Sequence, residues 1–126
     1  MELIIGGAFQ GKSDYAKKQH PEICWREGRD LGADEIFTAS GVLNLHEFIR
    51  KEMQAGQDLE GFGEELIRRN PNLILTSCEI GYGVVPVDAF DRAYREKTGR
   101  ICTVLASYSR KVTRVICGIG TVIKDA

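Results

Sequence analysis

The stretch near the start of the chain that decides the fold reads Leu3-Ile4-Ile5-Gly6-Gly7-Ala8-Phe9-Gln10-Gly11-Lys12-Ser13. A glycine, four free positions, a glycine, a lysine and a hydroxyl residue form the phosphate-binding loop of nucleoside triphosphate enzymes. Glycines let the backbone curl so that successive N–H groups point at phosphate oxygens. An apolar run precedes the loop and a helical segment follows it, as this motif requires. We therefore expect Gly6 to Ser13 to bind the phosphates of a nucleotide.

Lys12 and Ser13 are the residues of this motif that bring chemistry of their own. The lysine of such a loop adds a positive charge near the β- and γ-phosphates, and the hydroxyl is a ligand for Mg²⁺. The helix that follows directs the positive end of its dipole at the same anion. The alternative is a glycine-rich turn that matches the pattern by chance, and the flanking strand and helix argue against it.

The composition is that of one ordinary globular domain, which we assign to residues 1–126. Hydrophobic residues make up 43% of the chain and charged residues 28%. A formal net charge of -1 argues against a nucleic-acid surface built on bulk positive charge. No apolar run reaches membrane-spanning length, and the first residues form a predicted strand instead of a signal peptide. We expect a cytoplasmic protein.

The four cysteines are scattered along the chain without a paired CxxC spacing. Cys78 and Cys117 lie in apolar runs, which favours buried thiols over zinc ligands or disulfides. This use of cysteine fits a reducing compartment.

The apolar pattern predicts strands that alternate with helices. The predicted strands cover residues 2–5, 34–39, 73–79 and 112–117, with a short extended piece after residue 120. The predicted helices cover residues 12–19, 44–55, 58–69, 88–97 and 100–110, with Asn44, Asp58 and Asp88 as caps and a break at Thr98-Gly99. Residues 22–32 are expected to form a connection in which Trp25 packs as an anchor, with a position beside a ligand as the alternative. The alternation predicts an α/β fold like that of P-loop NTPases, with a mostly parallel sheet, helices on both faces and ligands at the carboxyl ends of the strands.

A second candidate site residue, Glu79, ends the apolar run from Leu73 to Cys78. A buried strand that ends in a single acidic residue has the pattern of a Walker B strand, whose carboxylate holds Mg²⁺ directly or through water. We expect Glu79 to lie opposite Ser13 and to share the metal with it. The alternative is an acidic residue exposed at the edge of a loop.

The segment that follows resembles a known family. Glu79-Ile80-Gly81-Tyr82-Gly83-Val84-Val85-Pro86 is similar to the signature glutamate–valine–glycine–x–glycine–isoleucine–valine–proline of the adenosylcobinamide kinase/adenosylcobinamide-phosphate guanylyltransferase family. The similarity continues through Phe90, Arg92, Tyr94-Arg95, Gly99-Arg100 and Val115 to Ile119. The loop from Gly6 to Ser13 is also the family's form of the phosphate loop. The resemblance covers the first and last thirds of the chain well and the middle poorly.

The resemblance implies an enzyme of late cobalamin assembly, working with Mg²⁺ and ATP or GTP. Members of that family transfer a phosphoryl group to the aminopropanol hydroxyl of adenosylcobinamide and then attach GMP through a guanylyl-histidine intermediate. On this reading Gly6 to Ser13 hold the triphosphate, and Lys12 neutralises the transferred group. Ser13 and Glu79 hold the metal, and Glu79 is also a candidate base. The resemblance further implies a small-molecule substrate and a homo-oligomer.

The middle of the chain departs from that family. Full-length members carry a longer insertion with the guanylylated histidine, and we do not find that segment here. The chain contains two histidines, His20 and His46. His46 lies off the apolar stripe of its predicted helix, so we expect it to face solvent, with a nucleophilic role as the alternative. A kinase without the guanylyl step, or a nucleotide-binding or regulatory relative with reduced catalysis, remains open.

Overall fold

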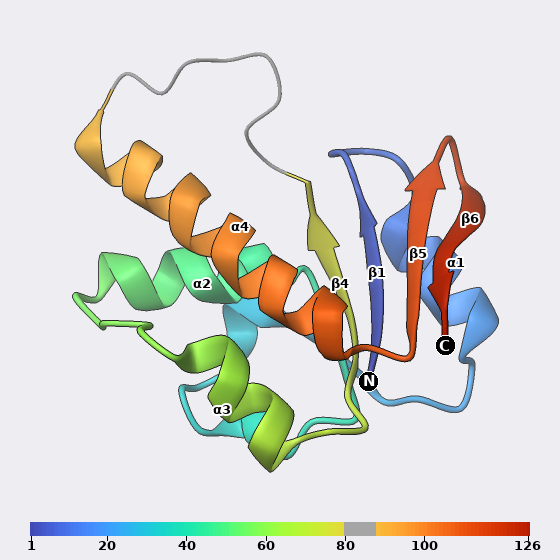
Figure 1. Ribbon diagram of the computed structural model, residues 1–126, viewed down its shortest axis with the longest axis horizontal. Helices are drawn as coiled ribbons and strands as arrows, with labels where there is room; N and C mark the ends of the chain where they lie inside the picture. The colour runs from blue at the N-terminus through green and yellow to red at the C-terminus, as the bar shows by residue number, and fades with distance from the viewer. Residues whose placement is uncertain (80–87) are drawn as a thin grey trace.

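The computed structural model describes residues 1–79 and 88–126, and within them a six-stranded sheet ordered β2-β3-β4-β1-β5-β6 forms the centre of the molecule (Figure 1). The strands are β1 (Glu2–Gly6), β2 (Trp25–Glu27), β3 (Gly41–Leu43), β4 (Ile74–Cys78), β5 (Lys111–Ile116) and β6 (Ile119–Asp125). The described helices are α1 (Lys12–Gln19), α2 (Leu45–Gln54), α3 (Phe62–Arg69) and α4 (Ala89–Tyr108), with single 3₁₀ turns η1 (Gly28–Asp30) and η2 (Glu35–Phe37). Neighbouring strands run parallel except β6, which is antiparallel to β5. The predicted α/β fold with a mostly parallel sheet is confirmed.

Helices cover both faces of the sheet, as the sequence predicts. On one face Ala16 of α1 packs against Ile4 and Val115. On the other face α2, α3 and α4 bury a larger cluster that includes Phe48, Leu66 and Leu105 together with strand residues. Figure 1 shows α2, α3 and α4 together on the side of the sheet opposite α1. Removal of this apolar surface from water supplies the main driving force for the fold.

The central strand β1 carries the start of the candidate loop. Its Leu3 and Ile4 are both 1% exposed, because successive residues of a strand point to opposite faces and both faces are covered. β1 pairs with β4 on one side and β5 on the other, and Gly6 lies opposite Cys78. The residues after Gly6 therefore lie at the carboxyl edge of the sheet, where parallel α/β sheets bind ligands.

The strand predicted at residues 34–39 is wrong. These residues form η2, and the strand lies further along, at β3. The backbone carbonyls of Ile36 and Ala39 accept hydrogen bonds from the side-chain amide of Asn70, at 3.0 Å and 2.8 Å. A side chain thus satisfies groups that a strand would pair in a ladder, while Ile36 and Phe37 still reach the core from the turn.

The connection predicted at residues 22–32 contains a strand, β2, at the edge of the sheet. Trp25 on this strand packs against the cluster beneath α1, and its indole N–H donates to the carbonyl of His20 at 3.2 Å. The predicted packing role of Trp25 is confirmed. His20 itself pairs with β1, since its Nε2 lies 2.6 Å from a carboxylate oxygen of Glu2.

Two predicted helix boundaries also change. α3 begins at Phe62 instead of Asp58, because Gly61 adopts a left-handed φ of 73° directly before the helix. The break predicted at Thr98-Gly99 is absent, and α4 continues through it to Tyr108. The predicted cap of this helix is confirmed, since Asp88 accepts the backbone N–H of Asp91 at 2.6 Å.

The chain ends in a hairpin between β5 and β6. Its turn residues Cys117 and Gly118 have positive φ angles of 52° and 76°, as two-residue hairpin turns with the right-handed twist of strands require. Cys117 is exposed there, so the prediction of a buried thiol is wrong for it, whereas Cys78 is half-buried. Residues 80–86 of the segment that resembles the family signature lie outside the described residues.

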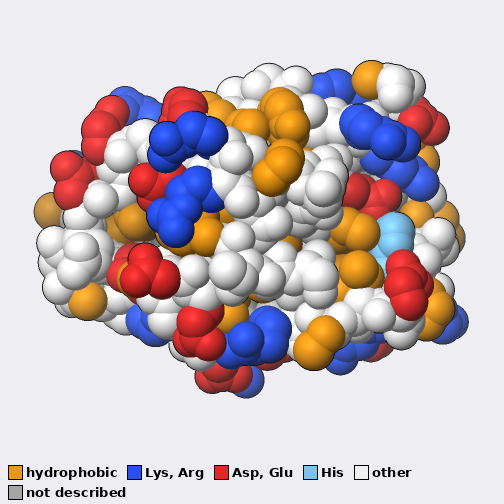
Figure 2. Space-filling view, turned by 90° about the horizontal axis from the view of Figure 1, so that it is seen from below, with side chains coloured by type: hydrophobic (Ala, Val, Ile, Leu, Met, Phe, Trp, Pro, Cys, Tyr) orange, Lys and Arg blue, Asp and Glu red, His pale blue; other side chains and the backbone are white. Residues whose placement is uncertain are grey.

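No helix in the described ranges is long and apolar enough to cross a membrane. Figure 2 shows Lys and Arg side chains interspersed with Asp and Glu on the face seen from below. That face therefore has no single-sign patch of the kind that nucleic-acid surfaces use.

Candidate functional site: the loop from Gly6 to Ser13 and its cavity

The loop between β1 and α1 needs glycine at two positions, Gly11 for its backbone conformation and Gly6 for its close contact with β5. Gly11 takes the left-handed φ of 86°, and Phe9 also has a positive φ of 62°. A Cβ on Gly6 would lie 2.6 Å from the carbonyl oxygen of Val115, which is backbone and cannot move aside cheaply. Gly6 thus lets the end of β1 stay against β5 while the chain turns.

Gln10 fastens this loop to the hairpin at the end of the chain. Its side-chain Oε1 accepts the backbone N–H of Cys117 at 2.7 Å, and its carbonyl accepts the N–H of Gly118 at 2.8 Å. The loop is therefore held from both sides, by β1 and by a turn more than a hundred positions away in sequence. This is the structural role of Gln10, for which the loop motif gives no reason.

Lys12 and Ser13 begin α1 beside the loop. Lys12 is 7% exposed, and its ammonium donates to the carbonyl of Gly7 at 2.8 Å. In the part of the chain that the structure describes, no hydrogen bond uses the backbone N–H of Lys12 or Ser13. Unpaired N–H groups at a helix N-terminus, next to an ammonium, form a site suited to an anion.

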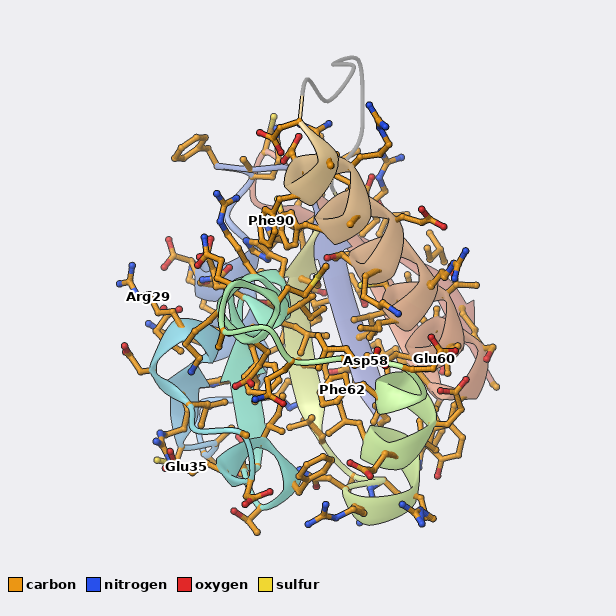
Figure 3. All side chains as sticks on the ribbon, turned by 90° about the vertical axis from the view of Figure 1, so that its left-hand side faces the viewer. Arg29, Glu35, Asp58, Glu60, Phe62 and Phe90 are labelled. Carbon is orange, nitrogen blue, oxygen red and sulfur yellow. The ribbon has the colours of Figure 1, made fainter. Side chains whose placement is uncertain are left out.

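A cavity of about 420 Å³ opens in front of these groups. It is lined by Ala8, Phe9, Gly11, Lys12, Ser13, Asp14, Glu27, Arg29, Asn44, His46, Glu47 and Cys78. Three of these residues follow or end neighbouring strands: Glu27 ends β2, Asn44 follows β3 and Cys78 ends β4. Figure 3 shows the side chain of Arg29, on η1, extending outward from the fold. The cavity thus joins the loop to the carboxyl edge of the parallel strands.

Glu79 is not brought to this cavity. Its carboxylate, 13% exposed, pairs with the guanidinium of Arg114 on β5 through two contacts, Nε to Oε1 at 2.8 Å and a terminal nitrogen to Oε2 at 3.2 Å. Side chains alternate along a strand, so Glu79 follows the side of Ser77 while Cys78 faces the loop. The residue of this strand that lines the cavity is Cys78, and burial raises the pKa of its thiol.

His46 does lie in the cavity, so the expectation that it faces solvent is wrong. Its side chain is 12% exposed, at the first turn of α2. Its Nδ1 accepts the backbone N–H of Cys78 at 3.1 Å. The backbone carbonyl of the same residue accepts the Tyr94 hydroxyl at 3.2 Å, which ties α2 to α4. Burial raises the pKa of Tyr94 to about 12, so the phenol stays protonated as a donor.

Asn44 and Glu27 are cavity residues that sequence reasoning did not identify. Asn44 has a left-handed φ of 60° and does not cap α2 with its side chain. Its amide donates instead to a carboxylate oxygen of Glu27 at 3.0 Å, and its backbone N–H donates to Thr76 Oγ1 at 2.8 Å. One feature of the sequence could have identified Asn44 as a cavity residue: it is a polar residue, of a type that tolerates the left-handed conformation, directly after the short apolar run Val42-Leu43.

A comparison with protein families matches residues 39–123 to the family described as cobinamide kinase / cobinamide phosphate guanyltransferase. The matched part covers more than half of the chain and includes Asn44, His46 and Cys78, while the loop from Gly6 to Ser13 lies before it. No curated protein matches the chain. The predicted family is confirmed, although the match includes the middle of the chain, where we expected poor resemblance, and leaves out residues 1–38: the chain belongs to the cobinamide kinase/cobinamide phosphate guanyltransferase family.

Proposed function

We propose that the protein is a nucleotide-dependent kinase that phosphorylates a cobinamide of the adenosylcobinamide type. The observation that carries the proposal is the loop from Gly6 to Ser13, with its free N–H groups and buried ammonium, opening into a cavity at the carboxyl edge of the sheet. Membership of a family of cobinamide kinases and guanylyltransferases supports the substrate class. The nucleotide, ATP or GTP, then lies with its phosphates on the loop.

The loop residues have separate roles in phosphoryl transfer: phosphate binding, neutralisation of charge and positioning. The N–H groups of Lys12 and Ser13 bind phosphate oxygens, and the Lys12 ammonium exchanges the Gly7 carbonyl for the transferred phosphoryl group. In such transfers positioning and neutralisation of charge do most of the work. The tether from Gln10 to the hairpin holds the loop in place before substrate binds, so less ordering entropy opposes binding.

Mg²⁺ fits the donor set of the cavity, which offers the Ser13 hydroxyl together with carboxylates. Bound there, it would neutralise charge on the phosphates. The carboxylates in the cavity lining are those of Asp14, Glu27 and Glu47, and the sequence pattern adds Glu79 as a further candidate partner. The sequence favours Glu79, which must first leave Arg114. The geometry favours Glu27, which lines the cavity and is held by Asn44.

Incubation with Mg²⁺, ATP or GTP and adenosylcobinamide tests the kinase directly. We expect adenosylcobinamide phosphate, detected by mass spectrometry, and its loss in Lys12→Ala. Lys17→Ala is the matched control, since Lys17 is exposed on the same helix and should retain activity. A folded protein that binds nucleotide and forms no product would contradict the proposal.

The second candidate is a nucleotide-binding or regulatory relative with reduced catalysis. It is favoured by the pairing of Glu79 with Arg114, which removes the sequence's candidate base from the cavity. Calorimetric titration with Mg²⁺ and each nucleotide separates the two, because this candidate predicts tight binding without transfer or hydrolysis. The same titration establishes the preference between ATP and GTP.

A further inference from the structure

The ring of His46 is the imidazole of the nucleotide cavity. The chain has two histidines, and the other, His20, pairs with Glu2 beneath the opposite end of β1. His46 lines the same cavity as Lys12 and Ser13 and is held at both ends, by the Cys78 backbone at Nδ1 and by the Tyr94 hydroxyl at its own carbonyl. With the backbone held by Tyr94 and Nδ1 held by Cys78, the ring has one further nitrogen to offer a ligand.

That atom is Nε2, and the contact at Nδ1 decides its state. A backbone N–H can only donate, so Nδ1 at 3.1 Å from the Cys78 nitrogen must carry a lone pair. The hydrogen of a neutral ring then sits on Nε2. Burial lowers the pKa of His46, as does the nearby Lys12 ammonium, while the Glu47 and Glu27 carboxylates oppose them. The ring is therefore neutral at neutral pH.

We propose that His46 binds a phosphate oxygen of the nucleotide or of the phosphorylated product as a neutral donor, through Nε2–H, and that it does not carry a guanylyl group. This inference deepens the proposed function and rests on it. Within the described residues, no hydrogen bond uses Nε2 of His46, and a carboxylate oxygen of Glu47 lies 3.5 Å from it. The donor is thus available for an oxygen that enters the cavity beside Lys12.

The same contact argues against a covalent role. Attack on the α-phosphorus of GTP would form an Nε2–P bond and expel pyrophosphate, so Nε2 would need a lone pair and the hydrogen would sit on Nδ1. That hydrogen would face the N–H of Cys78 across 3.1 Å, and two donors would then oppose each other in a buried place. Glu47 cannot remedy this, because a proton taken from Nε2 would leave an imidazolate.

Nuclear magnetic resonance of the protein labelled with ¹⁵N in histidine tests the donor state. We expect His46 as the Nε2–H tautomer at pH 7, with the Nε2 resonance shifting when Mg²⁺ and GTP or ATP are added. His20→Gln assigns the second set of signals. An Nδ1–H tautomer for His46, or a resonance that does not move in protein saturated with nucleotide, would overturn the inference.

Variants test the contact to phosphate. His46→Ala should weaken nucleotide binding by on the order of three- to tenfold, the value of one neutral hydrogen bond, and His46→Gln should recover most of it because its amide also donates. His20→Gln should bind as the wild type does. Melting temperatures check that each variant is folded, and equal weakening in the Ala and Gln variants would contradict the donor role.

Intact mass after exposure to Mg²⁺ and GTP tests the covalent alternative. We expect no added mass of GMP, and an adduct that disappears in His46→Gln would overturn the inference. The proposed function and the role of His46 are rejected by different results. A wild type that binds no nucleotide rejects the proposed function and with it the phosphate contact, whereas the wrong tautomer in a nucleotide-binding protein rejects the role of His46 alone.

Discussion

A single backbone N–H, that of Cys78, makes the ring of His46 sensitive to pH. Protonation of Nδ1 would replace an accepted hydrogen bond by two opposed donors. Because burial lowers the pKa of His46 in the folded protein, the unfolded chain takes up this proton first. The stabilising contribution is therefore fully present above the ordinary histidine pKa of about 6.5 and is lost as pH falls below it.

The first prediction concerns this loss. Between pH 7.5 and pH 5.5, conditions that bracket the ordinary histidine pKa of about 6.5, the wild type should lose more free energy of unfolding than His46→Gln, whose amide does not titrate. Urea denaturation at the two pH values measures both slopes. The charged groups that act on this position, Lys12, Glu27 and Glu47, are the same in both proteins, so the difference between the slopes belongs to His46. Identical slopes would contradict a neutral buried ring.

The second prediction separates the two candidate metal carboxylates. Glu27→Gln should weaken the Mg²⁺ dependence of nucleotide binding, because Glu27 lines the cavity with Ser13. Glu79→Gln should leave it nearly unchanged, because its carboxylate faces Arg114. Mg²⁺ titration at fixed nucleotide, followed by calorimetry, gives the midpoint for each variant. If Glu79→Gln weakened the Mg²⁺ dependence and Glu27→Gln did not, Glu79 would be the metal ligand, as the sequence pattern predicts.

At the scale of residues, the sequence predicts site residues that are adjacent in the chain and misses those that only the folded sheet brings together. Lys12 and Ser13 are identifiable because motif and site coincide in one turn of chain. Glu27 and Asn44 meet only because β2 and β3 pair side by side in the sheet. His46 is a further example. It lies off the apolar stripe of its helix, which predicts exposure to solvent, yet it lines a cavity formed with other parts of the chain. Pattern along one element cannot report what covers that element.

At the scale of elements, α4 illustrates how packing overrides local preference. Thr98-Gly99 predicts a break, since glycine costs about 1 kcal/mol relative to alanine in a helix interior. The helix nevertheless continues, because one face of it, formed by Tyr94, Thr98, Ile101 and Leu105, is buried on both sides of the glycine. Burying a large apolar side chain contributes about 1.5–3 kcal/mol, so this stripe outweighs one glycine.

The third prediction uses that glycine. A Cβ at Gly99 would meet no atom within 4 Å, since Gly99 lines the open cavity of about 620 Å³ between α3 and α4. Gly99→Ala should therefore stabilise the protein by about 0.5–1 kcal/mol through helix propensity alone. Chemical denaturation measures the change.

Gly63 provides the matched comparison on the facing helix. Its Cβ would lie 3.2 Å from Cγ1 of Val104, so Gly63→Ala must displace a neighbour and should gain less or lose stability. Phe62, at the start of that helix, stacks on Phe48 with ring centroids 5.5 Å apart, which fixes α3 against α2. Equal gains in the two variants would show that the α3–α4 contact is looser than its geometry implies.

At the scale of the whole molecule, the ends of the chain converge on the site. The loop after β1 is attached through Gln10 to the β5–β6 hairpin, so the last two strands help to hold the loop that lines the cavity. The sequence predicts the order of most elements and their parallel pairing. It does not predict this tether, because Gln10 and Cys117 carry no mutual pattern until β1 and β5 are neighbours.

The last prediction concerns the outer strand of the same hairpin. β6 ends the sheet order, and its Ile119 and Ile123 are 70% and 57% exposed, which is a template for pairing with another chain. We expect a homo-oligomer that buries this strand, and we expect Ile119→Lys combined with Ile123→Lys to give a monomer, measured by size-exclusion chromatography with light scattering. Gln54→Lys combined with Gln57→Lys controls for the two added charges at exposed positions outside β6. Because both isoleucines are exposed in one chain, the monomer should melt as a folded protein, and a wild type that stays monomeric at high concentration would refute the prediction.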